Sequence, residues 1–132
     1  MNHNQKVVID TNVLVSGLIN PSGPPGRILD MVLNGTLTMM VDDRLLSEYQ
    51  NVLSRKKLGF NLSDVQDLVS FIRASAEIVN ANPVKKKLPD EGDQPFLEVA
   101  RAGNCNVIIT GNLKHYPGVK EAISPKAFLD QF

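Results

Sequence analysis

Acidic side chains stand at three separated places where this sequence predicts the end of a strand or the first turns of a helix. They are Asp10, Glu48 and the pair Asp90 and Asp93. Carboxylates that the fold brings together repel one another unless a cation lies between them. Oxygen ligands without His or Cys favour Mg²⁺ or Mn²⁺ over Zn²⁺. Such ions stabilise phosphoryl oxygens and activate water, so these residue types point to metal-dependent hydrolysis of a phosphodiester or phosphate ester.

Asp10 has the most informative surroundings. It follows a β-branched run at residues 7–9, which is typical of a strand buried on both faces, and Thr11 and Asn12 can then begin a helix. A carboxylate at the carboxyl end of a central parallel strand lies where open α/β sheets bind ligands. The position is equally consistent with a plain helix N-cap, which is a common role of Asp.

The other acids also have structural interpretations. Glu48 falls at the margin of the apolar stripe of a helix, partly against the body of the protein, and an ordinary solvated Glu is the alternative. Asp42 and Asp43 are expected to cap that same helix. Asp93 stands at the N-cap of a short helix over residues 94–103. Position alone therefore assigns no catalytic role to these acids.

Buried strands and amphipathic helices alternate along the chain. Strands are predicted at residues 7–9, 37–41 and 106–110 with an edge strand at 77–79, and helices begin near residues 11, 28, 43, 61, 94 and 124. Residues 20–26 form a loop by composition, and the cations at 55–57 are expected to close the third helix. This alternation predicts a three-layer α/β/α fold with a mostly parallel central sheet, in a single domain over residues 1–132.

Right-handed crossovers bring the carboxyl ends of parallel strands to one edge of the sheet. Asp10, the acids at 90–93 and Asn112 each lie after a predicted strand or before a predicted helix at that edge. Glu48, about one turn into its helix, can reach the same place. The sequence therefore predicts that acids far apart along the chain meet in one pocket.

The composition is that of a globular protein. Of 132 residues, 42% are hydrophobic and 21% are charged, and no apolar run approaches the ~20 residues that a membrane span requires. Residues 1–6 lack the apolar stretch of a signal peptide. The lone Cys105 excludes an intrachain disulfide and is interpreted as core filler. We therefore expect a cytoplasmic protein.

Charge balance limits how a polyanion is bound. Fourteen Lys and Arg residues match fourteen Asp and Glu residues, so no global field attracts nucleic acid and a local patch must hold it. Candidate phosphate contacts are Arg44, the lysines at 85–87, Lys114 and His115, although each also suits a solvated face. An aromatic content of 5% argues against an extensive base-stacking platform.

Four short motifs, in this order and over nearly the whole chain, resemble those of the PIN domain nucleases. Val7-Val8-Ile9-Asp10-Thr11-Asn12 resembles the opening strand with its first acid, and Ser47-Glu48-Tyr49 resembles the helix with the second. Asp90-Glu91-Gly92-Asp93-Gln94-Pro95-Phe96-Leu97 resembles the third, in which Asp93, three residues before Phe, is the main ligand and Asp90 an auxiliary one. Thr110-Gly111-Asn112 resembles the fourth, and residues 124–129 resemble the closing segment of one bacterial subgroup.

The resemblance implies cleavage of single-stranded RNA with Mg²⁺ or Mn²⁺, often by the toxin of a toxin–antitoxin pair and often by a homodimer. It implies that Asp10, Glu48 and Asp93 hold metal and orient the attacking water. Thr11, Asn12 and Thr110 would be supporting polar groups, with Asn12 and Thr110 among the substrate-binding residues.

Two positions depart from the family pattern. Asn112 belongs by position to the catalytic set, but it stands where many members have Asp, so a neutral amide oxygen replaces an anionic one. Gly92 interrupts what is often a more acidic run. Both changes lower the negative charge of the site, so we expect weaker binding of a second metal, a dependence on RNA to complete the site, or an inactive site.

Three other classes are open alternatives. A haloacid-dehalogenase-like phosphohydrolase also begins with a strand and an Asp, but it requires a second Asp two residues on, where this chain has Asn12. A receiver-type phosphoacceptor needs an acceptor Asp on a middle strand and a later Lys partner, and no clear pair appears. A non-catalytic module that binds RNA or an antitoxin is favoured by Asn112.

Overall fold

One parallel sheet organises residues 5–132, which are the residues that the computed structural model describes. Its strands are β1 (Gln5–Ile9), β2 (Leu37–Val41), β3 (Glu77–Ile78), β4 (Ile108–Ile109) and β5 (Ala122–Ile123). Their order is β3-β2-β1-β4-β5, and each neighbouring pair runs parallel. Residues 1–4, which the sequence analysis included in the domain and in the test for a signal peptide, lie outside the described residues.

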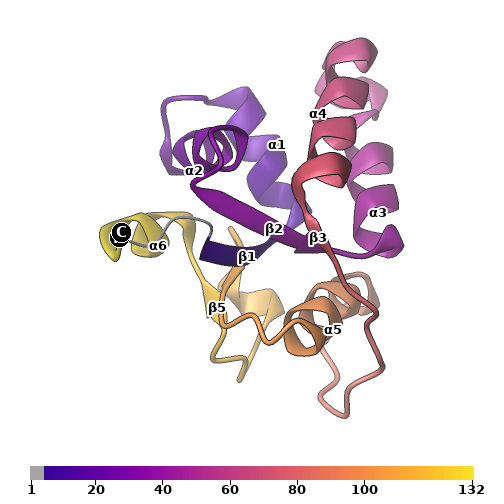
Figure 1. Ribbon diagram of the computed structural model, residues 1–132, viewed down its shortest axis with the longest axis vertical. Helices are drawn as coiled ribbons and strands as arrows, with labels where there is room; N and C mark the ends of the chain where they lie inside the picture. The colour runs from indigo at the N-terminus through magenta and orange to yellow at the C-terminus, as the bar shows by residue number, and fades with distance from the viewer. Residues whose placement is uncertain (1–4) are drawn as a thin grey trace.

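Helices cover both faces of this sheet (Figure 1). The helices α1 (Thr11–Ile19), α2 (Pro24–Leu33), α3 (Asp43–Leu53) and α4 (Leu62–Ser75) lie above it in this view, and α5 (Gln94–Ala102) lies below it. The short α6 (Pro125–Asp130) packs against α2. Single 3₁₀ turns, η1 (Lys56–Leu58), η2 (Glu91–Asp93) and η3 (Leu113–His115), lie in the connections. The predicted three-layer α/β/α fold is confirmed. No helix within residues 5–132 is long and apolar enough to cross a membrane.

The central strand β1 is apolar on both faces, and Val7, Val8 and Ile9 are completely buried. The chain adds β2 and β3 on one side of β1 and then crosses to the other side for β4 and β5. The direction of winding therefore reverses between β1 and β4. Ligands of open α/β sheets bind at such a switch point, outside the carboxyl ends of the strands. Asp10 follows β1 and Thr110 follows β4, so both lie at this point.

Some element boundaries differ from the predictions. The strand predicted over 106–110 is limited to Ile108–Ile109, although Val8 N also donates to the carbonyl of Val107 just before it. The short β5 that pairs with it was not predicted. Helix α2 begins at Pro24, inside the predicted loop 20–26, because Pro suits the first helical position.

The cations at 55–57 do not close α3 as predicted. The helix ends at Leu53, and Arg55 has extended φ and ψ angles of −64° and 133°, so the three residues belong to the connection that contains η1. The predicted cap by Asp42 is confirmed, since its side chain accepts a backbone hydrogen bond at the start of α3. The side chain of Asn61 caps α4 in the same way. Cys105 is buried, as expected of core filler.

Tyr49 fixes α3 against the end of the central strand. Its buried hydroxyl donates a hydrogen bond of 2.6 Å to the carbonyl of Ile9, the residue before Asp10. Its ring packs against Phe96 of α5 with ring centroids 6.3 Å apart. Because Glu48 precedes Tyr49 in α3, this contact sets how close Glu48 lies to Asp10.

Replacing Tyr49 by Phe keeps the ring and removes the hydrogen bond to Ile9. A net loss of about 1–2 kcal/mol in the free energy of unfolding is expected, since a buried carbonyl loses a donor. Urea denaturation followed by circular dichroism measures the change. An unchanged midpoint with an unchanged slope would show that this bond does not hold α3 in place.

Candidate active site

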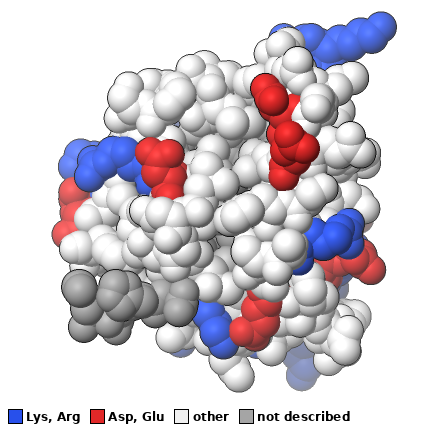
Figure 2. Space-filling model, turned by 45° about the horizontal axis from the view of Figure 1, so that its top comes forward, with Lys and Arg blue, Asp and Glu red and all other residues white. Residues whose placement is uncertain are grey.

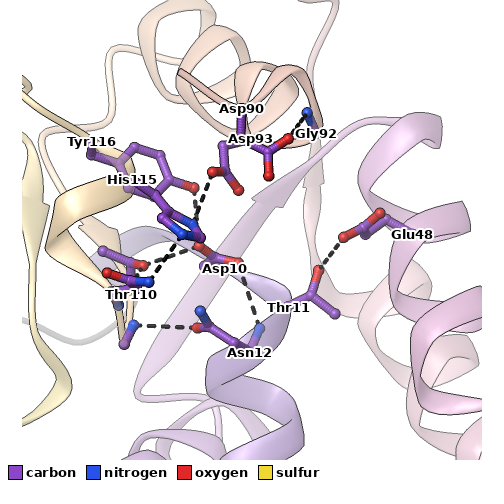
Figure 3. A network of polar contacts seen from close by, with 12 residues as sticks. Asp10, Thr11, Asn12, Glu48, Asp90, Gly92, Asp93, Thr110, His115 and Tyr116 are labelled. Carbon is purple, nitrogen blue, oxygen red and sulfur yellow. Dashed lines mark hydrogen bonds and ion pairs between the residues drawn. The ribbon is translucent and has the colours of Figure 1, made fainter. Parts of the chain in front are cut away.

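Two hydroxyl groups hold Asp10 at the end of β1. Its Oδ2 accepts a hydrogen bond from Thr110 Oγ1 at 3.0 Å and another from the Tyr116 hydroxyl at 3.1 Å (Figure 3). Burial, and then the charge of Asp10, raise the pKa of Tyr116, so that its hydroxyl stays protonated and donates. The Asp10 Oδ1 accepts a long bond of 3.5 Å from Asn12 N and thereby caps α1. The two interpretations of Asp10, helix cap and site group, are therefore compatible.

The first turn of α1 joins the two elements beside it. Thr11 Oγ1 donates to Glu48 Oε2 at 3.2 Å, which links α1 to α3. On the other side, the backbone N–H of Gly111 donates to Asn12 Oδ1 at 3.2 Å, which links the loop after β4 to α1. Glu48 is half-buried, as its place on the helix margin predicts. These bonds bring three distant segments of the sequence to one edge of the sheet.

The loop before α5 is closed by the side chain of Gln94. Its Nε2 donates to the carbonyl of Lys86 at 2.8 Å, and its Oε1 accepts from the backbone N–H of Leu88 at 3.0 Å. Together these two bonds fix the chain just before the acidic motif. The lysines at 85–87 are thus held in an exposed loop, and Lys86 and Lys87 do not line the pocket described below.

Asp90 and Asp93 have different roles in the turn η2. Asp90 Oδ1 accepts from the backbone N–H of Gly92 at 2.8 Å, so Asp90, an expected auxiliary metal ligand, caps the turn and is exposed. Asp93 occupies the predicted N-cap position of α5, but its side chain makes no capping bond. With φ and ψ of −86° and −18°, Asp93 already has helical backbone angles, which leaves its carboxylate free to face the site.

The Asp93 carboxylate is buried without a matching donor. The residue is 9% exposed, and its Oδ2 accepts no hydrogen bond from residues 5–132. His115 Nδ1 lies 3.1 Å from this oxygen but out of line for a hydrogen bond. Burial raises the pKa of Asp93 to about 6, with a further increase from the charge of Asp10 and a partly offsetting effect of His115. Asp93 is therefore a buried acid that forms no ion pair with Lys or Arg among the described residues.

His115 connects Asp93 to Asn112. The imidazole Nε2 lies 3.0 Å from Asn112 Nδ2, on the opposite side of the ring from Asp93. When the amide nitrogen donates to Nε2, the proton of a neutral imidazole is on Nδ1, the atom that faces Asp93. Asn112 also donates its backbone N–H to Thr110 Oγ1 at 3.1 Å. In this structure Asn112, predicted as a catalytic residue, thus orients the groups around the pocket.

An open pocket of about 380 Å³ collects most of the predicted residues. Those that line it are Asp10, Thr11, Asn12, Glu48, Asp93 and His115. Thr110 lies behind Asp10, and Asn112 lies behind His115. Asp90 and Lys114 are exposed and do not line the pocket. Arg44, another candidate phosphate contact, is held by ion pairs of 2.8 Å to Asp42 and to Glu98.

Three residues of this site were not predicted from the sequence. Tyr116 directly follows the predicted site residue His115, and this position could have indicated it. Its bond to Asp10, however, depends on how that loop folds. Arg55 and Lys57 line the pocket, whereas the sequence analysis assigned them to a helix terminus. Their position depends on the path of the chain after Leu53, for which the sequence carries no clear signal.

The donors around the pocket fit a hard divalent cation. A buried carboxylate oxygen of Asp93 without a donor, close to the charge of Asp10, is the arrangement that such an ion stabilises. The ligand set is not assembled in advance, since no three His, Cys, Asp or Glu side chains in residues 5–132 form a ready cluster. Glu48 is instead bonded to Thr11.

Comparison with known proteins gives three findings. A family model described as a PIN domain matches residues 6–114. The uncharacterised protein MJ1680 of Methanocaldococcus jannaschii is 39% identical over 111 residues, which cover 81% of this chain and 70% of that protein. The crystal structure of VapBC2 from Rickettsia felis, bound to a DNA fragment from their promoter, has a similar fold, with a TM-score of 0.60 and 16% identity over 90% of this chain and 96% of that one.

The raised pKa of Asp93 predicts a pH-dependent loss of stability. The pKa is about 6 in the folded protein against 3.8 for an ordinary Asp. Between these values the folded state binds more protons, so the free energy of unfolding falls as pH rises through this window. In the absence of metal, Asp93→Asn is expected to be more stable than wild type above pH 6, by about 1–3 kcal/mol.

Urea denaturation in EDTA across this pH range measures the effect. The matched control is Asp30→Asn, the same change at an exposed residue of α2, for which the difference from wild type should stay near zero. Parallel stability curves for wild type and Asp93→Asn would contradict the expected destabilisation by the Asp93 charge.

Proposed function

The chain belongs to the PIN domain family, as its four motifs predicted, and from this premise we propose that it is a metal-dependent endoribonuclease that cleaves single-stranded RNA. PIN domains are generally nucleases, which makes hydrolysis of a phosphodiester the expected reaction. The observation that carries the proposal is the convergence of Asp10, Glu48 and Asp93 on one pocket, with a buried oxygen of Asp93 left without a donor.

In this proposal Asp10, Glu48 and Asp93 hold Mg²⁺ or Mn²⁺. When bound, such an ion neutralises the carboxylates, stabilises the charge on phosphoryl oxygens and promotes attack by water. Asp10 is restrained by Thr110 and Tyr116 before any ligand binds, so its free edge faces the pocket in a defined direction. Asp90, the proposed auxiliary ligand, adds negative charge near Asp93 although its own carboxylate caps η2.

The remaining polar residues hold and orient the reactants. The pocket carboxylates orient the attacking water, and His115, kept in place by Asn112, restricts the position of Asp93. We propose that His115, with 42% of its side chain exposed, and the exposed Lys114 contact RNA phosphates from the loop after β4. Asn12 holds this loop by accepting a hydrogen bond from Gly111, and Thr110 holds it by donating one to Asp10.

A second candidate is a module that binds RNA or an antitoxin without cleavage. The observation that favours it is the Asn112 amide, which contacts His115 and adds no negative charge to the pocket. A dehalogenase-like phosphohydrolase has less support, because Asn12 stands at its second acidic position and accepts a bond from Gly111. Cleavage assays separate these classes.

We further propose that this protein has an antitoxin partner, by analogy with VapBC2, and that it acts as a toxin in the cytoplasm. A homodimer stays a prediction of the resemblance.

An apolar groove supports the partner proposal. It lies where α1, α2 and α4 meet and is lined by Leu18, Leu29, Leu33, Phe60, Leu68 and Phe71, with Asp64 and Asp67 beside them. Figure 2 shows the face above the sheet, where charges of both signs are scattered around a largely uncharged centre. An antitoxin segment with apolar and basic side chains would complement this groove.

Labelled single-stranded RNA tests the enzyme directly. With Mg²⁺ or Mn²⁺ the wild-type protein should cleave it, EDTA should abolish cleavage, and Asp10→Asn or Glu48→Gln should lower the rate by at least about 100-fold. Binding without cleavage would instead support the module. Release of phosphate from small esters would support the phosphohydrolase.

Metal binding gives an independent readout. Mn²⁺ should raise the melting temperature of wild type and should raise that of Asp10→Asn much less, because a ligand that binds only the folded state stabilises it. The increase should be larger above pH 6 than at pH 5, since metal binding requires deprotonated Asp93. An equal increase in both proteins would place the ion elsewhere.

The groove is tested by introducing a charge. Leu33 is 47% exposed in the groove and Leu113 is 49% exposed outside it. Leu33→Asp should weaken capture of the product of an adjacent antitoxin reading frame by at least about tenfold, while Leu113→Asp leaves it unchanged, because only the first charge is buried against the partner. Equal capture by both variants in a pull-down titration would exclude this groove.

A further inference from the structure

The segment after α3 carries two cations into the carboxylate pocket. Arg55 and Lys57 line this pocket together with Asp10, Glu48 and Asp93, whereas Lys56 between them does not. Backbone bonds alone shape the segment, from Leu58 N to Arg55 O at 3.1 Å and from Gly59 N to Lys56 O at 3.0 Å. Gly59 closes the turn with a φ of 70°, in the left-handed region that glycine tolerates. The side chains of Arg55 and Lys57 therefore have no part in holding the turn.

Neither cation is used within the protein. Arg44 pairs with Asp42 and Glu98, and Arg101 pairs with Glu121 at 2.6 Å. By contrast, Arg55 and Lys57 are exposed and form no ion pair or side-chain hydrogen bond with any described residue. Among the described residues the ion-pair partner of Asp93 is His115, so the two cations share its pocket without pairing with it.

An anionic ligand that extends along the pocket satisfies both groups of charges. The carboxylates suit a cation and one phosphate, and Arg55 with Lys57 suit a second anion in the same pocket. Arg presents a planar fork that binds phosphate oxygens in pairs, and Lys adds a point charge. Because the chain has no net charge, attraction of a polyanion must come from such a local pair.

We propose that Arg55 and Lys57 form a phosphate subsite that binds the phosphodiester next to the one that is cleaved. This inference rests on the proposed ribonuclease function, for which it supplies a substrate contact. The subsite holds the backbone of the strand against the wall formed by the end of α3 and η1. The subsite recognises a negative charge at a fixed distance from the phosphodiester that is cleaved. It therefore favours a chain of at least two phosphodiesters over a lone phosphate ester.

The test compares Arg55→Gln, Lys57→Gln and the double variant with Lys56→Gln. The control removes the same charge from the same turn at a residue that does not line the pocket. Binding of labelled single-stranded RNA is measured by fluorescence anisotropy over a range of salt, in an Asp10→Asn background that keeps the RNA intact. Unchanged thermal unfolding of all the variants checks that the turn still folds.

Each single variant should lose about 2- to 5-fold in affinity and the double variant about 10-fold. The slope of log affinity against log salt should fall by about 0.7 for each cation removed, and so by about 1.4 in the double variant. Lys56→Gln should leave affinity and slope unchanged. An equal loss in Lys56→Gln, or an unchanged slope in the double variant, would overturn the subsite.

The outcomes separate this inference from the proposed function. If otherwise wild-type protein cleaves RNA and the double substitution changes neither binding nor the KM for cleavage, the subsite is wrong and the nuclease stands. If the protein never cleaves RNA but the double variant loses binding as expected, Arg55 and Lys57 are confirmed as contacts to RNA phosphates, and the nuclease is wrong. If the double variant loses binding of polyglutamate but keeps that of RNA, the cations serve an acidic protein and the subsite is overturned.

Discussion

Mutual repulsion among carboxylates is the main constraint on the site, and it arises where the buried residues 7–9 of β1 end. Asp10 cannot move away, because Thr110 and Tyr116 hold one of its oxygens and β1 is fixed on both sides. The charge of Asp10, added to burial, then raises the pKa of Asp93 to about 6. Acids that are kept together without an ion pair to Lys or Arg among the described residues make the fold less stable in the absence of a cation. The proposed metal ion would relieve this repulsion.

The order of the strands explains why these acids meet. Because β1 lies between β2 and β4, the loop after β4 comes beside the start of α1, where Asn12 binds Gly111. On the other side, Tyr49 ties α3 to Ile9 and brings Glu48 within reach of Thr11. The site is therefore held by side-chain bonds at strand ends and helix starts. These bonds also fix where the neighbouring loops lie. Rigid elements of this kind keep charged groups close despite their repulsion.

Cations of this chain differ in whether they form ion pairs. Arg44 and Arg101 are paired with buried or half-buried acids and serve the fold. Arg55 and Lys57 are exposed in the pocket without an acidic partner among the described residues. A protein without net charge binds a polyanion through local cations, and Arg55 and Lys57 are the two that line this pocket.

The sequence alone determined the α/β architecture and the main acids, because hydrophobic periodicity and strand-end acids are local patterns. The run before Asp10 and the stripe around Glu48 predicted a buried strand and a half-buried helix margin, and both are observed. Only the tertiary structure decided which polar groups touch. The bond from Tyr116 to Asp10 joins residues 106 positions apart, and the entry of Arg55 into the pocket depends on where α3 ends. Such contacts arise from packing between distant segments, which no local pattern encodes.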